Sequence, residues 1–300
     1  MAKFLYYILY GVLKMVALLP FFILYGLADF IFALLYYVVR YRRKVVETNL
    51  TESFPEMDAA TRKRIEREFY HNFADYIVET IKLLHISNRQ MSRRLRFENL
   101  ELLERLADEG RSVAIYFSHC GNWEWAPSVT LHLPDKAAGR KIDFCQVYRP
   151  LRNVAFDRLM LKVRSRFGSL SFPKDSVFRS LFYLKRENVL TVTGFMSDQK
   201  PSHGDPTEIV MFLNHPTAII AGTERLARKM GMAAIYWDVE KPSRGHYIIK
   251  CKAMADNVAD TEQGSVTRCY ASMLEQTIRR NPSIWLWTHK RWKIPVNMPR

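Results

Sequence analysis

A histidine and a glutamate close together in the chain are the side chains of this sequence best suited to proton transfer. His119 follows the apolar run 112–118, and Glu124 comes five residues later. An imidazole that is oriented by a carboxylate acts as a general base near neutral pH. Gly121 permits a tight turn between the two. We therefore predict that His119 and Glu124 form a pair that removes a proton from the substrate.

Two further groups of polar residues follow expected strands. Arg149, Arg164 and Arg166 lie at the end of one strand and on the helix after it, where guanidinium groups suit an anionic ligand. Asp198 and Gln199 follow another apolar run. We expect these five residues to bind substrate. From the residues alone, the alternatives of a solvated basic face and a surface turn stay open.

The four cysteines predict neither a metal site nor a redox motif. None of them forms a C-x-x-C pair. The chain also lacks the H-E-x-x-H zinc motif, the P-loop, the G-x-S-x-G motif and the dinucleotide fingerprint. We therefore expect no metal and no cofactor. Cys120 is not favoured as a nucleophile, because chain neighbours such as Cys120 and His119 point apart on an extended or turning backbone.

Residues 109–300 alternate between β-like runs and helical stretches. The expected strands are 112–117, 141–147, 189–193, 208–212, 233–239 and 247–252. The expected helices are 152–167, 175–186, 218–230 and 261–279. This alternation predicts an α/β domain with a mixed sheet covered by helices. His119 then lies just beyond a strand, at the edge where open α/β sheets bind their ligands.

A helical segment, residues 49–108, is expected to pack on this domain. Apolar residues recur every four positions from Ile65 to Ile81, which is the pattern of an amphipathic helix. A second short helix is expected over residues 100–108, before Gly110.

Residues 1–48 are expected to form an anchor in the membrane. The stretch 15–39 carries the single charge Asp29, and it is long enough to cross a bilayer as a helix that kinks or begins at Pro20. The basic cluster 40–44 follows it, so the positive-inside rule places the rest of the chain in the cytoplasm. Five tyrosines near this stretch keep open an alternative, in which the helix lies in one leaflet.

The balance of charge limits the partners. The formal net charge is +15, which fits nucleic acid, an anionic membrane or an acidic protein. The closing run 285–293 interleaves tryptophans with basic residues. Such a run can stack nucleobases, sit at a membrane interface or pack into the core.

Taken in order, these segments resemble a known family. The segments that carry the resemblance are Tyr41–Leu50 before Phe54-Pro55, Glu68–Phe73, the H-x4-E motif of His119 and Glu124, Tyr148-Arg149-Pro150, Asp198-Gln199 and Trp287–Lys293. The chain resembles the bacterial late acyltransferases of lipid A biosynthesis, within the wider lysophospholipid-acyltransferase-like group. The resemblance covers nearly the whole chain. Two features depart from related patterns, namely Asn214-His215-Pro216 in the middle and Glu124 where the glycerolipid branch has aspartate.

The resemblance implies a mechanism, partners and a location. His119 would deprotonate a hydroxyl of a lipid A precursor, which attacks an acyl thioester carried on acyl carrier protein, with Glu124 holding the imidazole. Arg164 matches the family's essential arginine by position. The implied partners are acyl carrier protein, the lipid acceptor and the membrane, without nucleic acid. The implied location is the bacterial inner membrane, with a single N-terminal anchor and the catalytic domain on the cytoplasmic side.

Two other functions stay open. One is acyl transfer to another polar lipid, such as a lysophospholipid, an aminolipid or a glycolipid. The other is a membrane-tethered protein that binds anionic ligands without catalysis.

Overall fold

A mixed sheet forms the centre of the molecule. The computed structural model describes residues 2–298, with side chains from Tyr6 onward. In spatial order, the strands are β1 (Leu95–Glu98), β10 (His246–Ala255), β9 (Ala233–Ser243), β2 (Val113–Phe117), β6 (Leu190–Met196), β4 (Arg140–Tyr148) and β3 (Lys136–Ala137), while β5 (Leu170–Pro173) also pairs with β4. The predicted fold class is confirmed.

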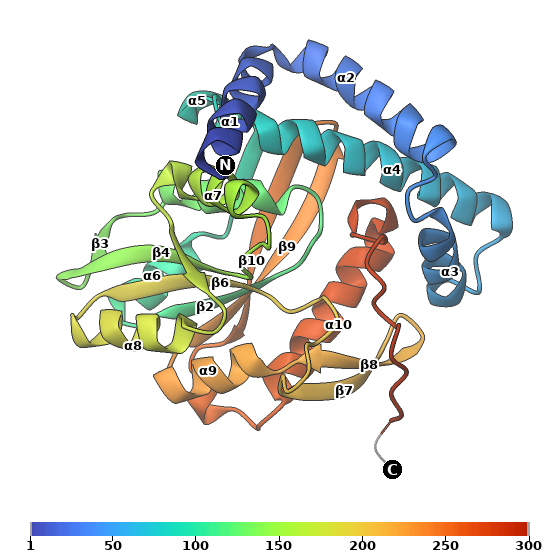
Figure 1. The fold of residues 1–300 in the computed structure, drawn as a ribbon. Coiled ribbons are helices and arrows are strands. Elements are labelled where there is room, and N and C mark those ends of the chain that lie inside the picture. Colours follow the sequence, from blue (N-terminus) through green and yellow to red (C-terminus); the bar gives the residue numbers. More distant parts are fainter. Residues whose placement is uncertain (1, 299–300) are drawn as a thin grey trace.

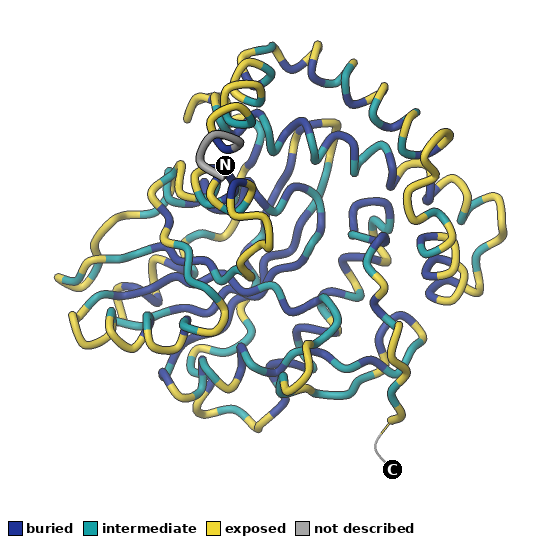
Figure 2. The backbone as a smooth tube through the Cα atoms, in the orientation of Figure 1, coloured by how far each residue is buried: buried dark blue, intermediate teal, exposed yellow. Residues whose placement is uncertain are grey.

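The middle of the sheet is parallel, and its strand β2 is fully buried. Strand β2 lies between β6 and β9 and runs parallel to both, and β6 runs parallel to β4. All five residues of β2 are buried (Figure 2), which explains why its sequence is a continuous apolar run instead of an alternating one. The carboxyl ends of β2, β4 and β6 therefore meet at one edge, where the candidate site lies.

Helices pack around this sheet (Figure 1). They are α5 (Asn88–Arg94), α6 (Glu101–Asp108), α7 (Val154–Arg164), α8 (Val177–Arg186), α9 (Gly222–Met230) and α10 (Ser265–Arg280). A 3₁₀ helix, Trp123–Leu131, follows the turn after β2. Its Pro127 lacks an amide hydrogen, which disfavours a regular α-helix at this point.

One expected strand lies outside the main sheet. Strands β7 (Thr207–Phe212) and β8 (His215–Ile220) form a separate antiparallel hairpin. Their turn places Leu213 and Asn214 at positive φ. Residues 218–220, predicted to be helical, belong to β8, and α9 begins only at Gly222.

Four helices precede α5 and the sheet. They are α1 (Ala2–Leu18), α2 (Phe21–Ala33), which continues through a π-helical turn at Leu34–Val38, then α3 (Arg43–Ser53) and α4 (Ala59–Lys82). The predicted start of a helix at Pro20 is confirmed. Among the described residues, Phe21–Val38 is the one helix that could cross a membrane by its length and composition. It runs along α4 (Figure 1).

The N-terminal segments share the core of the α/β domain. The main cluster of buried apolar side chains extends from Phe21 to Trp287. Strand β1, inside the segment expected to be wholly helical, pairs with β10 at the edge of the sheet. The proposed segments 1–48, 49–108 and 109–300 thus each contribute side chains to this cluster.

Candidate active site

A cleft of about 420 Å³ opens at the carboxyl ends of the central strands. Its walls come from the turn after β2, the ends of β4 and β6, and the start of α9. The predicted site residues that line it are His119, Glu124, Arg149, Arg164 and Gln199. Ligands of open α/β sheets bind in this place.

The imidazole of His119 is bonded to Asp198. His119 Nδ1 lies 2.7 Å from Asp198 Oδ1, and the backbone N–H of His119 donates to Asp198 Oδ2 at 2.9 Å. The other ring nitrogen of His119, Nε2, lies 3.0 Å from the side-chain nitrogen of Gln199, and both residues line the cleft. A carboxylate on Nδ1 leaves the lone pair of a neutral imidazole on Nε2. The arrangement is that of a His–Asp dyad that faces the cleft.

Asp198 stays ionised although it is only 2% exposed. Burial opposes ionisation, but the charge of His119 and hydrogen bonds from His119 and from the Trp285 indole outweigh it and lower the pKa of Asp198 to about 2. Trp285 Nε1 donates to Asp198 Oδ2 at 2.9 Å. The carboxylate therefore remains available to hold Nδ1–H throughout the physiological range.

Glu124 binds Arg164. Arg164 Nε donates to Glu124 Oε2 at 2.8 Å, and the terminal nitrogen Nη2 donates to Oε1 at 2.7 Å. This is a bidentate pair of the kind that fixes a guanidinium plane. Among the described residues, no hydrogen bond joins His119 to Glu124. The expected partner of the imidazole is thus replaced by Asp198, and the two residues of the H-x4-E motif hold two different groups.

The remaining expected ligands divide into two sets. Arg149 lines the cleft together with Gln199. Arg166 is turned away, because its guanidinium donates to the carbonyl oxygen of Ile86. Asp198 lies behind His119 and is not part of the cleft wall. The expectation that Arg166 and Asp198 contact substrate is therefore not supported by their positions.

Comparison with known proteins identifies the family. A sequence profile described as bacterial lipid A biosynthesis acyltransferase matches residues 1–294. The chain belongs to this family. The lipid A biosynthesis lauroyltransferase of Escherichia coli K12 is 23% identical over 296 residues, which is 96% of this chain and 92% of that relative. The palmitoleoyltransferase of the same organism is 22% identical over 289 residues, 94% of this chain and 89% of that relative.

The C-terminal run of this acyltransferase belongs to its core. Trp285, Trp287 and Arg291 are each at most 4% exposed, and the rings of Trp285 and Trp287 meet edge to face, with centroids 4.8 Å apart. Of the three alternatives for this run, packing into the core is the one that the structure supports. The role of Trp285 in holding Asp198 had no signal in the sequence, since 87 residues separate the two.

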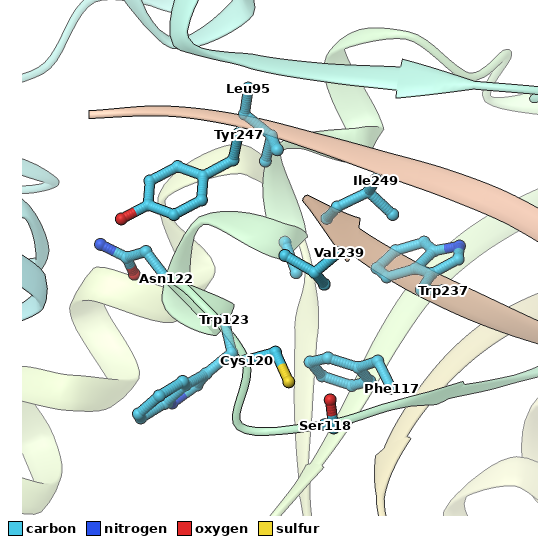
Figure 3. Close-up of a pocket in the computed structure, with 11 residues that line it drawn as sticks. Leu95, Phe117, Ser118, Cys120, Asn122, Trp123, Trp237, Val239, Tyr247 and Ile249 are labelled. Carbon is cyan, nitrogen blue, oxygen red and sulfur yellow. The ribbon is translucent and has the colours of Figure 1, made fainter. Parts of the chain in front are cut away.

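Cys120 is not placed for catalysis. It lines a small, mainly apolar cavity together with Phe117, Val239 and Ile249 (Figure 3), and it is not among the residues that line the cleft. Burial raises the pKa of its thiol well above the ordinary range. Burial therefore favours the neutral thiol over the thiolate that a nucleophile requires.

A buried glutamate that the sequence analysis missed supports the catalytic turn. Glu79 of α4 accepts hydrogen bonds from Asn122 at 3.0 Å, from the Tyr247 hydroxyl at 2.8 Å and from the Tyr25 hydroxyl at 3.2 Å. Burial raises its pKa, although nearby Lys241 and the Asn122 hydrogen bond act in the opposite direction. Figure 3 shows the Tyr247 hydroxyl and the Asn122 amide directed to the same side.

Replacing this carboxylate should destabilise the fold in proportion to the donors left unsatisfied. We expect Glu79→Ala to lower the free energy of unfolding by about 3 kcal/mol, because each orphaned buried donor costs about 1–3 kcal/mol. Glu79→Gln keeps one acceptor oxygen, so its loss should be smaller. Thermal unfolding of the detergent-solubilised proteins measures both. Equal melting temperatures for Glu79→Ala and the unmodified protein would contradict this role.

His289 should make the fold sensitive to mild acid. Burial lowers its pKa from the ordinary 6.5 to about 4, so the unfolded chain takes up a proton before the folded one does. Its contribution to stability is complete above pH 6.5 and is lost as the pH falls through 4. Between pH 7.5 and pH 4.5, we expect the melting temperature of His289→Gln to fall by less than that of the unmodified protein. The exposed His203→Gln is the control, and equal losses in all three proteins would rule the effect out.

Proposed function

We propose that this acyltransferase moves a fatty acyl chain from an acyl carrier protein thioester to a hydroxyl of a lipid A precursor. The general base in this proposal is His119, oriented by Asp198. The observation that carries it is the 2.7 Å contact between His119 Nδ1 and Asp198, which leaves Nε2 directed to the cleft. A base must lie within hydrogen-bond reach of the proton that it removes.

The acceptor hydroxyl takes the place of the Gln199 amide at Nε2. As Nε2 removes the proton, the hydroxyl oxygen bonds to the thioester carbonyl carbon, and the carbonyl oxygen becomes negatively charged. The intermediate then collapses, the carbon–sulfur bond breaks, and the leaving thiolate receives the proton from the imidazolium. Asp198 stabilises this imidazolium, as the acid member of a triad does. These reaction steps require no covalent acyl-enzyme intermediate.

Arg164 supplies positive charge in the same cleft. Glu124 engages Nε and Nη2, so the remaining N–H groups of the guanidinium are free for a substrate. A fixed guanidinium suits either the carbonyl oxygen that becomes negative or a phosphate of the lipid acceptor. Because Glu124 fixes its plane, Arg164 needs little reorganisation when the substrate binds.

The charge of the chain supports the proposed donor and location. The net charge of +15 favours an acidic carrier protein and an acceptor that bears phosphates. Arg149 lies on the wall of the cleft, where either of them would arrive. The basic cluster 40–44 favours a catalytic domain on the cytoplasmic side of the inner membrane.

A transfer assay with purified protein tests the proposal. The acyl carrier protein thioester is supplied with a lipid A precursor, and with a lysophospholipid in a parallel reaction. Mass spectrometry should show one added acyl chain on the lipid A precursor, and about 10²–10⁴-fold less product with His119→Ala. Transfer to the lysophospholipid alone would remove the lipid A assignment, and activity only with a coenzyme A thioester would remove the proposed donor.

A further inference from the structure

Both N-terminal helices carry large apolar side chains that are exposed. On α1 the exposed residues include Val12, Met15 and Leu18, and on α2 and its π-helical turn they include Phe22, Phe30 and Val38. Phe22 is 76% exposed and Val38 is 73% exposed. Figure 2 shows this exposed edge along the outer side of α2. An apolar surface of this extent marks a site of interaction.

The opposite side of α2 is bound to the domain. Tyr25 donates its hydroxyl hydrogen to Glu79 at 3.2 Å. Asp29 accepts from Arg244 at 2.7 Å, and Arg244 also donates to Asp75 at 2.7 Å. Tyr25 and Asp29 of α2 therefore both bind partners on the domain, and the Asp29 side chain remains 53% exposed.

Both ends of α2 are also tied to the domain. At its start, Lys82 Nζ donates to the carbonyl oxygens of Ala17 and Leu19, each at 2.8 Å. These are carbonyls that the break at Pro20 leaves without helical partners. Beyond its end, the Arg43 guanidinium pairs with Glu66 at 3.0 Å. The helix is therefore held against α4 along its whole length.

A helix that crosses the bilayer could not keep these contacts. Leaving the domain would place Asp29 and the Tyr25 hydroxyl in hydrocarbon without partners, which is costly. It would also strip Glu79 of a donor and Lys82 of its acceptors. We propose that α1 and α2 lie in one leaflet of a phospholipid bilayer, parallel to its plane, with their outer face among the acyl chains.

Charged side chains around the apolar surface also favour contact with a phospholipid bilayer. Arg40, Arg42 and Lys44 are exposed just after the π-helical turn. On the other side, Arg158 and Lys162 of α7 lie over the rings of Tyr6 and Tyr10, at 4.7 and 4.6 Å. Tyrosines beside cations are typical of the level of the lipid headgroups, and the cations attract anionic lipids.

The surface also leads to the cleft, an extension that rests on the proposed function. Helix α1 packs on α7 through Tyr6, Ala155 and Leu159. Leu151 and Val154, at the start of α7, are exposed, and Leu151 lines the cleft. A lipid acceptor can therefore move from the leaflet into the cleft without its chains crossing water.

Cross-linking in membranes tests whether α2 stays on α4. The Phe32 and His71 rings stack with centroids 3.5 Å apart, so Phe32→Cys with His71→Cys should form a disulfide on oxidation, in a Cys269→Ser background. The control pair is Phe22→Cys with His71→Cys, because Phe22 points outward on the same helix. We expect the first pair to cross-link and the control not to. Failure of the first pair in membranes would overturn the proposal.

The position of the two chain ends provides a second test. Tags are placed at the N-terminus and at the C-terminus, and protease is added to intact spheroplasts and to lysed ones. A helix that lies in one leaflet leaves both tags on one side, so both should be cut or protected together. Cleavage of the N-terminal tag alone would show a spanning helix. Neither test uses activity, so a failed transfer assay with both tags on one side would count against the proposed function only.

Discussion

Asp198→Asn should lower kcat by about 10⁴-fold while leaving the fold intact. An asparagine amide can donate to Nδ1, which places the ring hydrogen on Nε2 and leaves no lone pair to accept the substrate proton. The same change in a Ser-His-Asp triad costs about this factor. His119→Ala should fall in a similar range, about 10²–10⁴-fold, because it removes the base itself. Initial rates of acyl transfer at saturating acceptor measure both.

A matched substitution distinguishes this effect from a general loss of charge. Asp175 is exposed and lies before α8, so Asp175→Asn removes one carboxylate outside the cleft and should leave kcat unchanged. The double variant His119→Ala with Asp198→Asn should be no slower than His119→Ala alone, since Asp198 acts through the imidazole. Additive losses would refute the dyad.

Breaking the pair of Glu124 and Arg164 should affect stability and activity differently. Arg164→Ala leaves Glu124 buried and uncompensated, which is expected to cost about 3–5 kcal/mol. The double variant Arg164→Ala with Glu124→Ala removes both charges, so it should be more stable than Arg164→Ala. Its activity should remain low, because the guanidinium that faces the cleft is still missing.

Both measurements use the unmodified protein, Arg164→Ala, Glu124→Ala and the double variant. Thermal unfolding should show coupling between positions 124 and 164, because the double variant regains stability relative to Arg164→Ala. The rate of acyl transfer should not recover in the double variant. If the double variant regained turnover along with its melting temperature, Arg164 would be a structural residue without a part in the chemistry. Arg164→Lys adds a check, because lysine keeps the charge but cannot form the bidentate contact.

Much of the fold follows from patterns that are local in the sequence. The continuous apolar run of β2 and the regular spacing of α4 are each readable because burial repeats with the period of the backbone. Strands β1 and β5 are four residues long and lie on the edges of the sheet or beside them. They contain too few residues for an alternation of apolar and polar side chains to be recognised. The sequence predicts a helix at residues 218–220, which belong to β8, because a short apolar run fits either structure.

The site was harder to predict, because its bonds join distant parts of the chain. The types of His119, Glu124, Arg164 and Asp198 were recognised, but their pairing was inferred from proximity in sequence. In the structure Asp198 reaches His119 across 79 residues and Arg164 reaches Glu124 across 40. Parallel pairing of β2 with β6 brings the first two together, and spacing along the chain contains no information on that pairing.

Trp285 links the C-terminal segment to the His119–Asp198 dyad. Its indole donates to the carboxylate that orients the imidazole, so a growing polypeptide lacks this hydrogen bond until residue 285 has been added. A chain that ended between Ala255 and Trp285 would contain strands β1 to β10 but would lack this donor to Asp198.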